Sequence, residues 1–190
     1  MNIVVAACKN SGIGFKNILP WHIPSELKYF KCLTLGKGNN AVIMGKKTWK
    51  SLKKPLPKRD NYVLSSTIDE KEKPYILRSN HHIEILLDHN NYDDIWLIGG
   101  EQIYNSFIYT PYVKSIYYTY IDKNFTCDTY FPDIPNNFKE VFRSNFYKEN
   151  GLNYNFNVFE NSDLKQNSNN LQNIKECLNY MNRLDYKEIV

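Results

Sequence analysis

The sequence predicts a single α/β domain built on a mainly parallel sheet. Short runs rich in Val, Ile and Tyr alternate along the chain with segments of helical character, an order that is typical of such sheets. The chain has 190 residues, and 42% of them are hydrophobic, which is enough to bury one substantial core. We therefore expect one domain and a short additional segment.

Five strands are expected where β-branched and aromatic residues cluster between Gly, Pro, Asn or Ser. They are residues 2–8, 41–45, 61–65, 95–98 and 113–121. Helices are expected between them, where the residue pattern has helical character. They are residues 25–35, 46–52, a weaker segment near 82–87, and 101–108. Strands and helices thus alternate in chain order, as in a parallel sheet with crossover helices.

The domain is expected to end in an antiparallel hairpin. Two aromatic-rich stretches, residues 138–148 and 154–160, are separated by a short Glu-Asn-Gly sequence that suits a turn. A hairpin of this kind would add antiparallel strands to the sheet. The predicted domain then spans residues 1–161.

The remaining residues, 162–190, are expected as a separate tail. Residues 162–172 are polar and rich in Asn, which is typical of a linker. Apolar residues then recur at helical spacing and predict a short amphipathic helix. These residues are Ile174, Leu178, Met181 and Leu184. Their apolar stripe could fold back on the domain or pair with another chain, and we expect a monomer.

Composition and charge exclude several classes of protein. The 24 basic and 20 acidic residues give a net charge of +4, an excess too small to indicate nucleic-acid binding by itself. The chain contains no apolar run long enough for a membrane span, and its first residues lack a signal-peptide pattern, so a cytoplasmic protein is expected. Its four cysteines lack metal-site spacing and are expected as reduced thiols. They are Cys8, Cys32, Cys127 and Cys177.

The first candidate site residue is Glu26, at the beginning of a predicted helix. Ser25 can cap this helix, and an acidic residue in the first turn is favoured there, so Glu26 could be an ordinary solvated carboxylate. However, Glu26 lies on the same helix face as Phe30, with Leu27 adjacent and Trp21 just upstream. Glu26 could therefore face an apolar cleft, where a carboxylate usually has a partner or a catalytic role.

Two glycine-containing turns are candidate phosphate sites. Gly45 ends an apolar strand and is followed by Lys46 and Lys47 at the start of a helix, and Gly99 and Gly100 separate another strand from a helix. Backbone amides at such turns bind phosphate, although each turn alone could be an ordinary connection. Two such turns in one sheet favour a dinucleotide. Neither matches the Rossmann or the nucleoside-triphosphatase pattern.

A third candidate is Arg59, which follows a rigid Pro-Leu-Pro-Lys turn. Its planar guanidinium suits a carboxylate ligand, although a solvent-exposed surface arginine is the alternative. The four histidines lack ligand spacing, so no metal ion is expected.

Taken in order, these motifs resemble the dihydrofolate reductase family. The resemblance rests on Leu-Pro-Trp with Pro-Ser-Glu-Leu-Lys-Tyr-Phe, Val-Ile-Met-Gly-Lys-Lys-Thr-Trp, Pro-Leu-Pro-Lys-Arg, Ile-Gly-Gly-Glu-Gln-Ile-Tyr, Tyr-Thr-Tyr-Ile-Asp and Asp-Thr-Tyr-Phe-Pro. It covers about residues 1–161. It implies a central, mainly parallel eight-stranded sheet flanked by helices, with an antiparallel C-terminal strand.

The resemblance also implies an activity: NADPH-dependent reduction of 7,8-dihydrofolate to tetrahydrofolate, which supports one-carbon metabolism and thymidylate synthesis. Hydride would move to pterin C6 and a proton to N5, and antifolates would be inhibitors. The implied catalytic residues are Glu26, Trp21 and Thr119. Glu26 would bind the pterin, Thr119 would orient Glu26, and Arg59 would bind the α-carboxylate of the glutamate tail. The implied substrate site comprises Val5, Glu26, Leu27, Phe30, Leu52, Lys54, Leu56, Arg59, Ile98, Tyr104 and Thr119.

For the cofactor, the family resemblance implies NADPH bound across both glycine turns, with a cis peptide bond between the paired glycines. Ser65, Ser66 and Arg78 would lie near the 2′-phosphate, and a loop over residues 13–19 would close on the nicotinamide. The implied cofactor site comprises Ala7, Ile13, Gly14, Asn17, Leu19, Lys46, Lys47, Thr48, Ser65, Ser66, Arg78, Gly99, Gly100, Glu101, Gln102, Ile103 and Tyr104.

Three other functions fit parts of the sequence. A pyrimidine reductase of riboflavin synthesis would share the sheet and the cofactor turns, but it lacks the cleft carboxylate for which Glu26 is the candidate. A non-catalytic NADPH-binding or RNA-binding regulator could retain the same site residues. The polar tail also leaves open that the chain is the reductase part of a bifunctional dihydrofolate reductase-thymidylate synthase.

Overall fold

The computed structural model describes residues 1–68, 75–89, 91–164 and 170–183, so Leu184 of the predicted tail helix lies outside the described residues. The elements follow in chain order: β1 (Asn2–Cys8), β2 (Gly12–Gly14), α1 (Pro24–Leu35), β3 (Asn40–Gly45), α2 (Lys46–Ser51), β4 (Asp60–Leu64), β5 (Tyr75–Leu77), α3 (Asn80–His89), β6 (Asp94–Leu97), α4 (Glu101–Phe107), β7 (Ser115–Ile121), β8 (Thr129–Tyr130), β9 (Phe138–Arg143), β10 (Tyr147–Glu149), β11 (Leu152–Asn161) and α5 (Asn170–Arg183).

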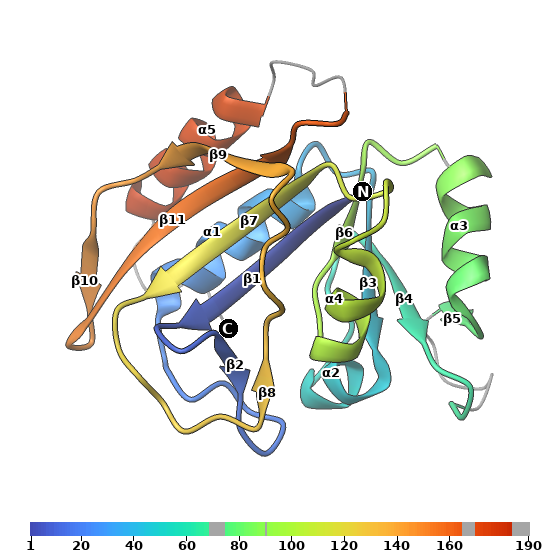
Figure 1. Ribbon diagram of the computed structural model, residues 1–190, viewed down its shortest axis with the longest axis horizontal. Coiled ribbons are helices and arrows are strands. Elements are labelled where there is room, and N and C mark those ends of the chain that lie inside the picture. Colours follow the sequence, from blue (N-terminus) through green and yellow to red (C-terminus); the bar gives the residue numbers. More distant parts are fainter. Residues whose placement is uncertain (69–74, 90, 165–169, 184–190) are drawn as a thin grey trace.

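The centre of the molecule is a twisted sheet with the strand order β10-β11-β7-β1-β6-β3-β4-β5 (Figure 1). The strands from β7 to β5 in this order are parallel, whereas β11 runs antiparallel to β7, β9 and β10. The predicted, mainly parallel eight-stranded sheet is confirmed, and β9 pairs with β11 beside this path. Within the described residues, β2 and β8 form a separate two-stranded sheet.

Two apolar layers cover the sheet because successive strand residues point to opposite faces. Val4 of β1 packs in the cluster that contains Tyr29 and Leu33 of α1 and Ile174 of α5. Its neighbour Val5 packs in the other cluster, with side chains of α3 and α4. Helices α1 and α5 therefore lie together on one face of the sheet, and α3 and α4 lie on the other (Figure 1).

The end of the domain folds as the predicted hairpin, with one difference. The first arm is divided into β9 and β10, and both pair with the long strand β11 around a turn at Asn150 and Gly151. Asn150 and Gly151 both have positive φ, 50° and 74°, which Asn and Gly tolerate best. A register shift between Val158 and Phe159 lies in the β9 pairing.

The predicted cap of α1 by Ser25 is wrong. The helix begins at Pro24, after Ile23, and no side chain of its own caps it. Proline suits a first helical position, because it has no N–H to satisfy and its φ is already helical. The N–H of Ser25 instead donates to the Glu149 carboxylate, 3.0 Å away on the hairpin. An acid from another element thus supports the helix start, where negative charge is favourable.

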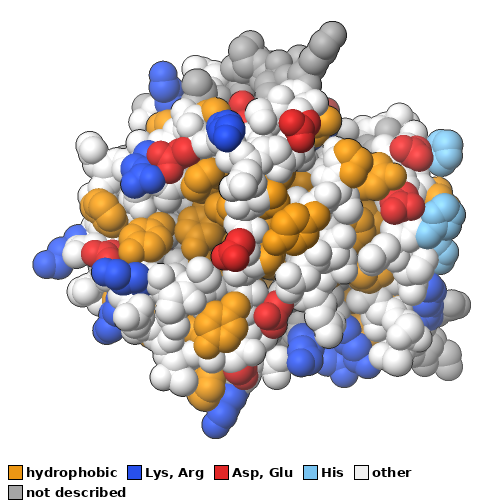
Figure 2. All heavy atoms as spheres, viewed as in Figure 1, with side chains coloured by type: hydrophobic (Ala, Val, Ile, Leu, Met, Phe, Trp, Pro, Cys, Tyr) orange, Lys and Arg blue, Asp and Glu red, His pale blue; other side chains and the backbone are white. Residues whose placement is uncertain are grey.

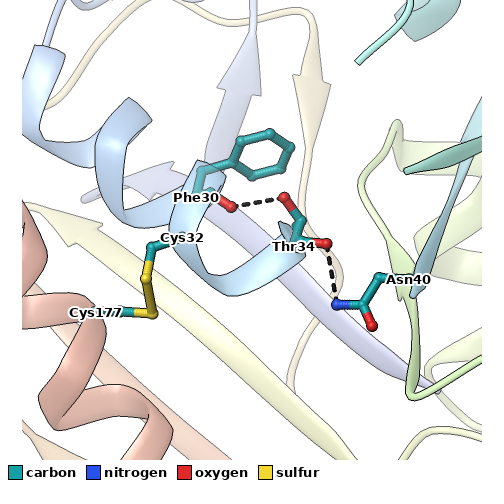
Figure 3. Close-up of a disulfide and its surroundings, with 5 residues drawn as sticks. All are labelled: Phe30, Cys32, Thr34, Asn40 and Cys177. Atoms are coloured by element: carbon teal, nitrogen blue, oxygen red, sulfur yellow. Dashed lines mark hydrogen bonds between the residues drawn. A yellow bond between two sulfur atoms is a disulfide. The ribbon is translucent and has the colours of Figure 1, made fainter. Parts of the chain in front are cut away.

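The prediction of four reduced thiols is wrong for Cys32 and Cys177, which form a disulfide with their Cα atoms 5.5 Å apart (Figure 3). Sequence spacing could not show this pair, because α5 folds back on α1 and joins residues 145 positions apart. Cys8 and Cys127 are free, with their sulfurs 3.9 Å apart. Helices in the described ranges are all too short or too polar to cross a membrane.

Candidate active site

The site begins with a buried carboxylate on the sheet-facing side of α1. The Glu26 side chain is 6% exposed, so the alternative of a solvated first-turn glutamate is excluded. The Thr119 hydroxyl of β7 donates to Glu26 Oε1 across 3.4 Å, a long hydrogen bond. Thr119 pairs with Ala6 of β1 in the sheet, so the acid lies over two central strands.

Burial dominates the electrostatics of this carboxylate. Desolvation raises the pKa of Glu26 to about 7, and the hydrogen bond from Thr119 opposes that rise. The field of Glu26 contributes to a raised pKa at Tyr104, after burial as the larger cause. The Tyr104 hydroxyl donates to Val4 O at 2.9 Å and lies beside Gly99. The acid therefore lies within electrostatic reach of the paired-glycine turn.

A buried indole lies just upstream of the same helix. Trp21 is 8% exposed, and its ring packs against Phe125 with centroids 5.6 Å apart. Its Nε1–H is buried and has no hydrogen-bond partner among the described residues. Buried donors in native proteins are nearly always satisfied, so this N–H suits a polar ligand or an ordered water molecule.

One face of α1 carries three side chains with distinct chemistry. Glu26, Phe30 and Thr34 are spaced four residues apart and therefore lie on the same side of the helix. Phe30 is half-buried and packs against the apolar cluster. The fully buried Thr34 hydroxyl lies near the end of the helix and donates to the carbonyl of Phe30 at 2.8 Å. Sequence reasoning missed Thr34, because an interior threonine carries no pattern of its own.

Arg59 lies at the Thr34 end of this face. Its Nη1 donates to the Thr34 hydroxyl at 2.6 Å, and its Nε donates to the carbonyl of Pro57 at 3.1 Å. The residue is 8% exposed, so the alternative of an ordinary surface arginine is wrong. Desolvation lowers the pKa of Arg59 to about 10, and within the described residues the guanidinium forms no ion pair. A buried cation of this kind suits an anionic ligand.

The two glycine turns lie side by side at one edge of the sheet, because β3 and β6 are adjacent and parallel. The Gly45 N–H donates to Gly99 O at 2.7 Å and joins the turns directly. The peptide bond between Gly99 and Gly100 is cis, as the family resemblance implies. The Thr48 side chain of α2 lies beside both glycines.

A second polar cluster follows the neighbouring strands β4 and β5. The Ser65 hydroxyl accepts the N–H groups of Thr67 and Ile68 at 3.2 Å, and Arg78 Nη1 donates to the carbonyls of Ser65 and Ile68. Lys46 Nζ donates to the Thr67 hydroxyl at 2.6 Å. Basic side chains gather on this side of the molecule, around α2 (Figure 2).

Comparison with known proteins agrees with this arrangement. Residues 1–161 match the family model described as dihydrofolate reductase. The chain is 38% identical to the dihydrofolate reductase of Drosophila melanogaster, over 84% of this chain and 96% of that protein. It is 36% identical to that of Gallus gallus, over 87% and 98%, and 35% identical to that of Buchnera aphidicola, over 83% and 97%.

The chain belongs to the dihydrofolate reductase family. It is accordingly an oxidoreductase that reduces dihydrofolate to tetrahydrofolate, with a nicotinamide cofactor, and acts in one-carbon metabolism. The helix α5 lies outside the residues that the family model matches.

The other substrate-site and cofactor-site residues that the dihydrofolate reductase resemblance implies differ in their burial and in the face of the sheet on which they pack. Leu52, Leu56 and Ile98 are half-buried and pack against the cluster on the α1 face. Leu27 is 39% exposed, and Lys54 is exposed. Val5 and Ala7 pack on the α4 face instead, and Ala6, which sequence reasoning did not select, packs on the α1 face. The alternation of β1 explains this difference.

Residues 13–19 comprise the end of β2 and the turn that follows it, in which residues 16–19 are exposed. Ile13 is half-buried and Gly14 is buried, whereas Asn17 is exposed with a φ of 63°. Ile18 and Leu19 are 67% and 50% exposed. Exposed apolar side chains at neighbouring positions are a feature of surfaces that make contacts with other molecules.

Arg59 also borders a polar recess of about 250 Å³ at the far end of α1. Its walls are Gly38, Asn39, Asn40, Lys58, Arg59, Asp60 and Tyr92. This recess lies at the opposite end of α1 from Glu26. Its polar walls do not match the apolar cleft that the family resemblance implies for the pterin.

Proposed function

We propose that this reductase uses NADPH to convert 7,8-dihydrofolate to 5,6,7,8-tetrahydrofolate, with Glu26 binding the pterin and Arg59 binding the tail carboxylate. The observation that supports this proposal most is the pattern along α1. A buried acid and a threonine that holds a buried guanidinium are eight residues apart, about 12 Å along a helix. Dihydrofolate has matching chemistry, with N–H donors on its ring and a carboxylate on its tail.

Glu26 would accept hydrogen bonds from the pterin amino group and ring nitrogen. The raised pKa of Glu26, about 7, means that a large fraction of its carboxyl group is ionised at neutral pH. The ionised carboxylate would favour the protonated form of the pterin. Thr119 would hold the carboxyl in orientation, and Trp21 would offer its N–H to a bound water molecule. We assign the delivery of the proton to N5 to water rather than to Glu26.

Phe30, Leu52 and Leu56 are the proposed apolar contacts for the middle of the substrate, between the two charged ends. All three are half-buried and pack against the same cluster as α1. These apolar side chains would exclude water from the bound substrate, as is usual in small-molecule sites. Desolvation by burial is also the cause of the raised pKa of Glu26.

The glycine turns fit a dinucleotide cofactor. A Cβ at Gly100 would meet the Thr48 hydroxyl at 3.5 Å, and Gly99 has a φ of 124°, so glycine leaves this backbone open to close approach. Lys46, the exposed Lys47 and Thr48 would hold the pyrophosphate, and Ser66 and Arg78 the 2′-phosphate. When bound, NADPH supplies the hydride that is transferred to pterin C6. The loop over residues 13–19 would exclude bulk water from the site.

The test is the oxidation of NADPH followed by its absorbance with dihydrofolate as substrate. Wild-type protein should turn over with dihydrofolate, and NADH should be the poorer cofactor. Glu26→Gln should lower kcat by at least about 100-fold, the size expected when one electrostatic contact to the charge of the transition state is lost, while the Kd of NADPH stays unchanged.

The matched control is Glu84→Gln, which changes a half-buried glutamate of α3 that pairs with His81. It should leave kcat at the wild-type value. A Glu26→Gln enzyme as fast as the control variant would remove Glu26 from the proposed mechanism.

A further inference from the structure

Helix α5 is attached by packing and by a covalent bond to α1, the helix that carries the proposed substrate-binding residues Glu26 and Phe30. Ile174, Cys177 and Met181 of α5 are at most 5% exposed and pack in the cluster that contains Tyr29 and Leu33 of α1. The Cys32–Cys177 disulfide joins the two helices directly. α5 lies beside α1 on the same face of the sheet (Figure 1).

Cys32 lies on the side of α1 that faces away from the substrate residues. It is two positions after Phe30, which corresponds to a rotation of about 200° around a helix. Figure 3 shows the Cys32 side chain reaching toward α5, whereas the Phe30 ring points away from the disulfide. The disulfide is therefore attached to the side of α1 that faces α5, whereas Glu26 and Phe30 lie on a different side of the helix, which we call its substrate side.

The substrate side of α1 also carries Thr34, which holds Arg59, the residue proposed to bind the tail carboxylate. Thr34 accepts a hydrogen bond from Arg59 Nη1, and its backbone carbonyl accepts one from Asn40 Nδ2 at 3.1 Å. Thr34 is only two residues beyond Cys32. A shift of this part of the helix would consequently displace both Phe30 and the anchor of Arg59.

We propose that α5 and the Cys32–Cys177 disulfide are a redox-sensitive brace that positions α1 for dihydrofolate. Cys32 and Cys177 are positioning residues, because they act through α1 and do not touch the substrate. This inference rests on the proposed function of Glu26 and Arg59. The glycine turns that would hold NADPH lie on other elements, so the brace should affect the substrate and not the cofactor.

Reduction releases the brace by ordinary thiol chemistry. A dithiol such as dithiothreitol supplies two electrons and two protons, the Cys32 Sγ–Cys177 Sγ bond breaks, and the dithiol closes into its own disulfide. Disulfides of proteins in reducing compartments are usually transient or redox-sensing. A bond between the substrate helix and an added helix is well placed for that role.

The experiment compares the full chain before and after treatment with dithiothreitol. Alkylation followed by mass measurement should find two of the four cysteines free before treatment and all four free afterwards. Reduction should raise the KM for dihydrofolate about fivefold, the lower end of typical coupling between sites. The KM for NADPH and kcat should not change. Tryptophan fluorescence should report the same loss of dihydrofolate affinity without turnover.

Two variants make the result specific. Cys32→Ser/Cys177→Ser should have the raised KM for dihydrofolate in both states, whereas Cys127→Ser, which removes a free thiol, should respond to dithiothreitol as the wild type does. An affinity for dihydrofolate that is unchanged after reduction, or four free thiols before it, would overturn the brace even if the enzyme is active. Absence of dihydrofolate-dependent turnover in both states would instead reject the proposed function.

Discussion

At the scale of single residues, the site is defined by two ionisable groups that are held away from water at opposite ends of α1. Glu26 is 6% exposed and Arg59 is 8% exposed. Burial raises the pKa of Glu26 and lowers the pKa of Arg59, and both shifts favour the neutral form of the group. Both groups therefore cost the folded protein stability that a complementary ligand can recover. This balance makes their contributions measurable by titration and by substrate truncation.

The raised pKa of Glu26 gives a pH dependence of stability with a defined sign. The unfolded acid has a pKa of 4.5 and the folded acid about 7, so the folded state binds more protons between these values. The contribution of Glu26 to stability is therefore most favourable below pH 4.5 and falls as the pH rises through 7. The total change is about 3 kcal/mol, at about 1.4 kcal/mol for each pKa unit.

The measurement is urea unfolding of wild type and Glu26→Gln at several pH values. Relative to the wild type, Glu26→Gln should become more stable by about 3 kcal/mol between pH 4.5 and pH 8. A difference that stays constant over this range would show that Glu26 is not the titrating group.

Arg59 predicts a selective loss of substrate affinity. Arg59→Lys keeps the charge but removes the planar fork, so the tail carboxylate should lose a charge-assisted hydrogen bond worth about 1.5–3 kcal/mol. The KM for dihydrofolate should rise about 10- to 100-fold. A dihydropterin without the glutamate tail should be reduced as well by the variant as by the wild type.

The control for Arg59→Lys is Arg143→Lys, because Arg143 pairs with Glu140 on β9 outside the site. It should leave both substrates unaffected. An equal loss for the truncated substrate would show that Arg59 acts on the fold rather than on the tail carboxylate.

Sequence patterns could identify Glu26 but not its surroundings. The spacing of Glu26 and Phe30 on one helix face is local information, and it pointed to the correct side of α1. Thr34 binds Arg59 across 25 positions of sequence, and Glu149 supports the start of α1 across 124. Such contacts depend on the tertiary fold, so no local pattern announces them.

At the scale of elements, length decided what could be predicted. The long strands β1, β7 and β11 and the helix α1 carry enough residues for a periodic pattern, and each was expected close to its observed bounds. β2, β5 and β8 have two or three residues each and were missed. A strand this short is formed by its partner rather than by its own sequence.

The contact of β2 with the segment before β8 can be tested at Gly12. A methyl group added there would lie 2.6 Å from Cys127 Cβ and 3.1 Å from Cys8 Sγ, closer than packed atoms allow. Gly12→Ala should lower the free energy of unfolding by about 1–3 kcal/mol, measured by urea titration.

A double-mutant cycle separates crowding from other effects of this substitution. Cys127→Gly removes the side chain that the new methyl group meets, so Gly12→Ala should cost less stability in that background. Strictly additive losses in the cycle would contradict the contact.

At the scale of the whole molecule, strand order brings the site together. β6 enters between β1 and β3, so the turn after β6 lies at the centre of the sheet. It lies beside Gly45 and next to the part of β1 that follows Ile3, the partner of Leu97. Ligands of such sheets bind at the carboxyl ends of the strands, near the point where the order reverses. The alternation of strands and helices along the chain predicted a parallel sheet, but it could not give the order of the strands, because that order depends on contacts between distant residues.

Cofactor selectivity should appear in the stability of the whole protein. At 100 times its Kd, NADPH should raise the free energy of unfolding by about 2.7 kcal/mol. NADH at the same concentration should stabilise less, because it lacks the phosphate assigned to Ser66 and Arg78. Thermal unfolding followed by circular dichroism gives both values.

In Arg78→Ala, NADPH and NADH should raise the free energy of unfolding by more similar amounts than they do in the wild type. In Arg143→Ala, the difference between the two cofactors should stay at the wild-type value. Equal stabilisation of the wild type by both cofactors would remove Arg78 from the proposed phosphate site.

The fold-back of α5 has a practical consequence for anyone who shortens the chain. A chain that ends at residue 161 would leave Cys32 as an unpaired thiol. It would also expose to solvent the hydrophobic surface of α1 on which Ile174 and Met181 pack. Two shortened molecules could then offer each other matching faces and reactive sulfurs. They should accumulate as disulfide-linked dimers that separate on a reducing gel.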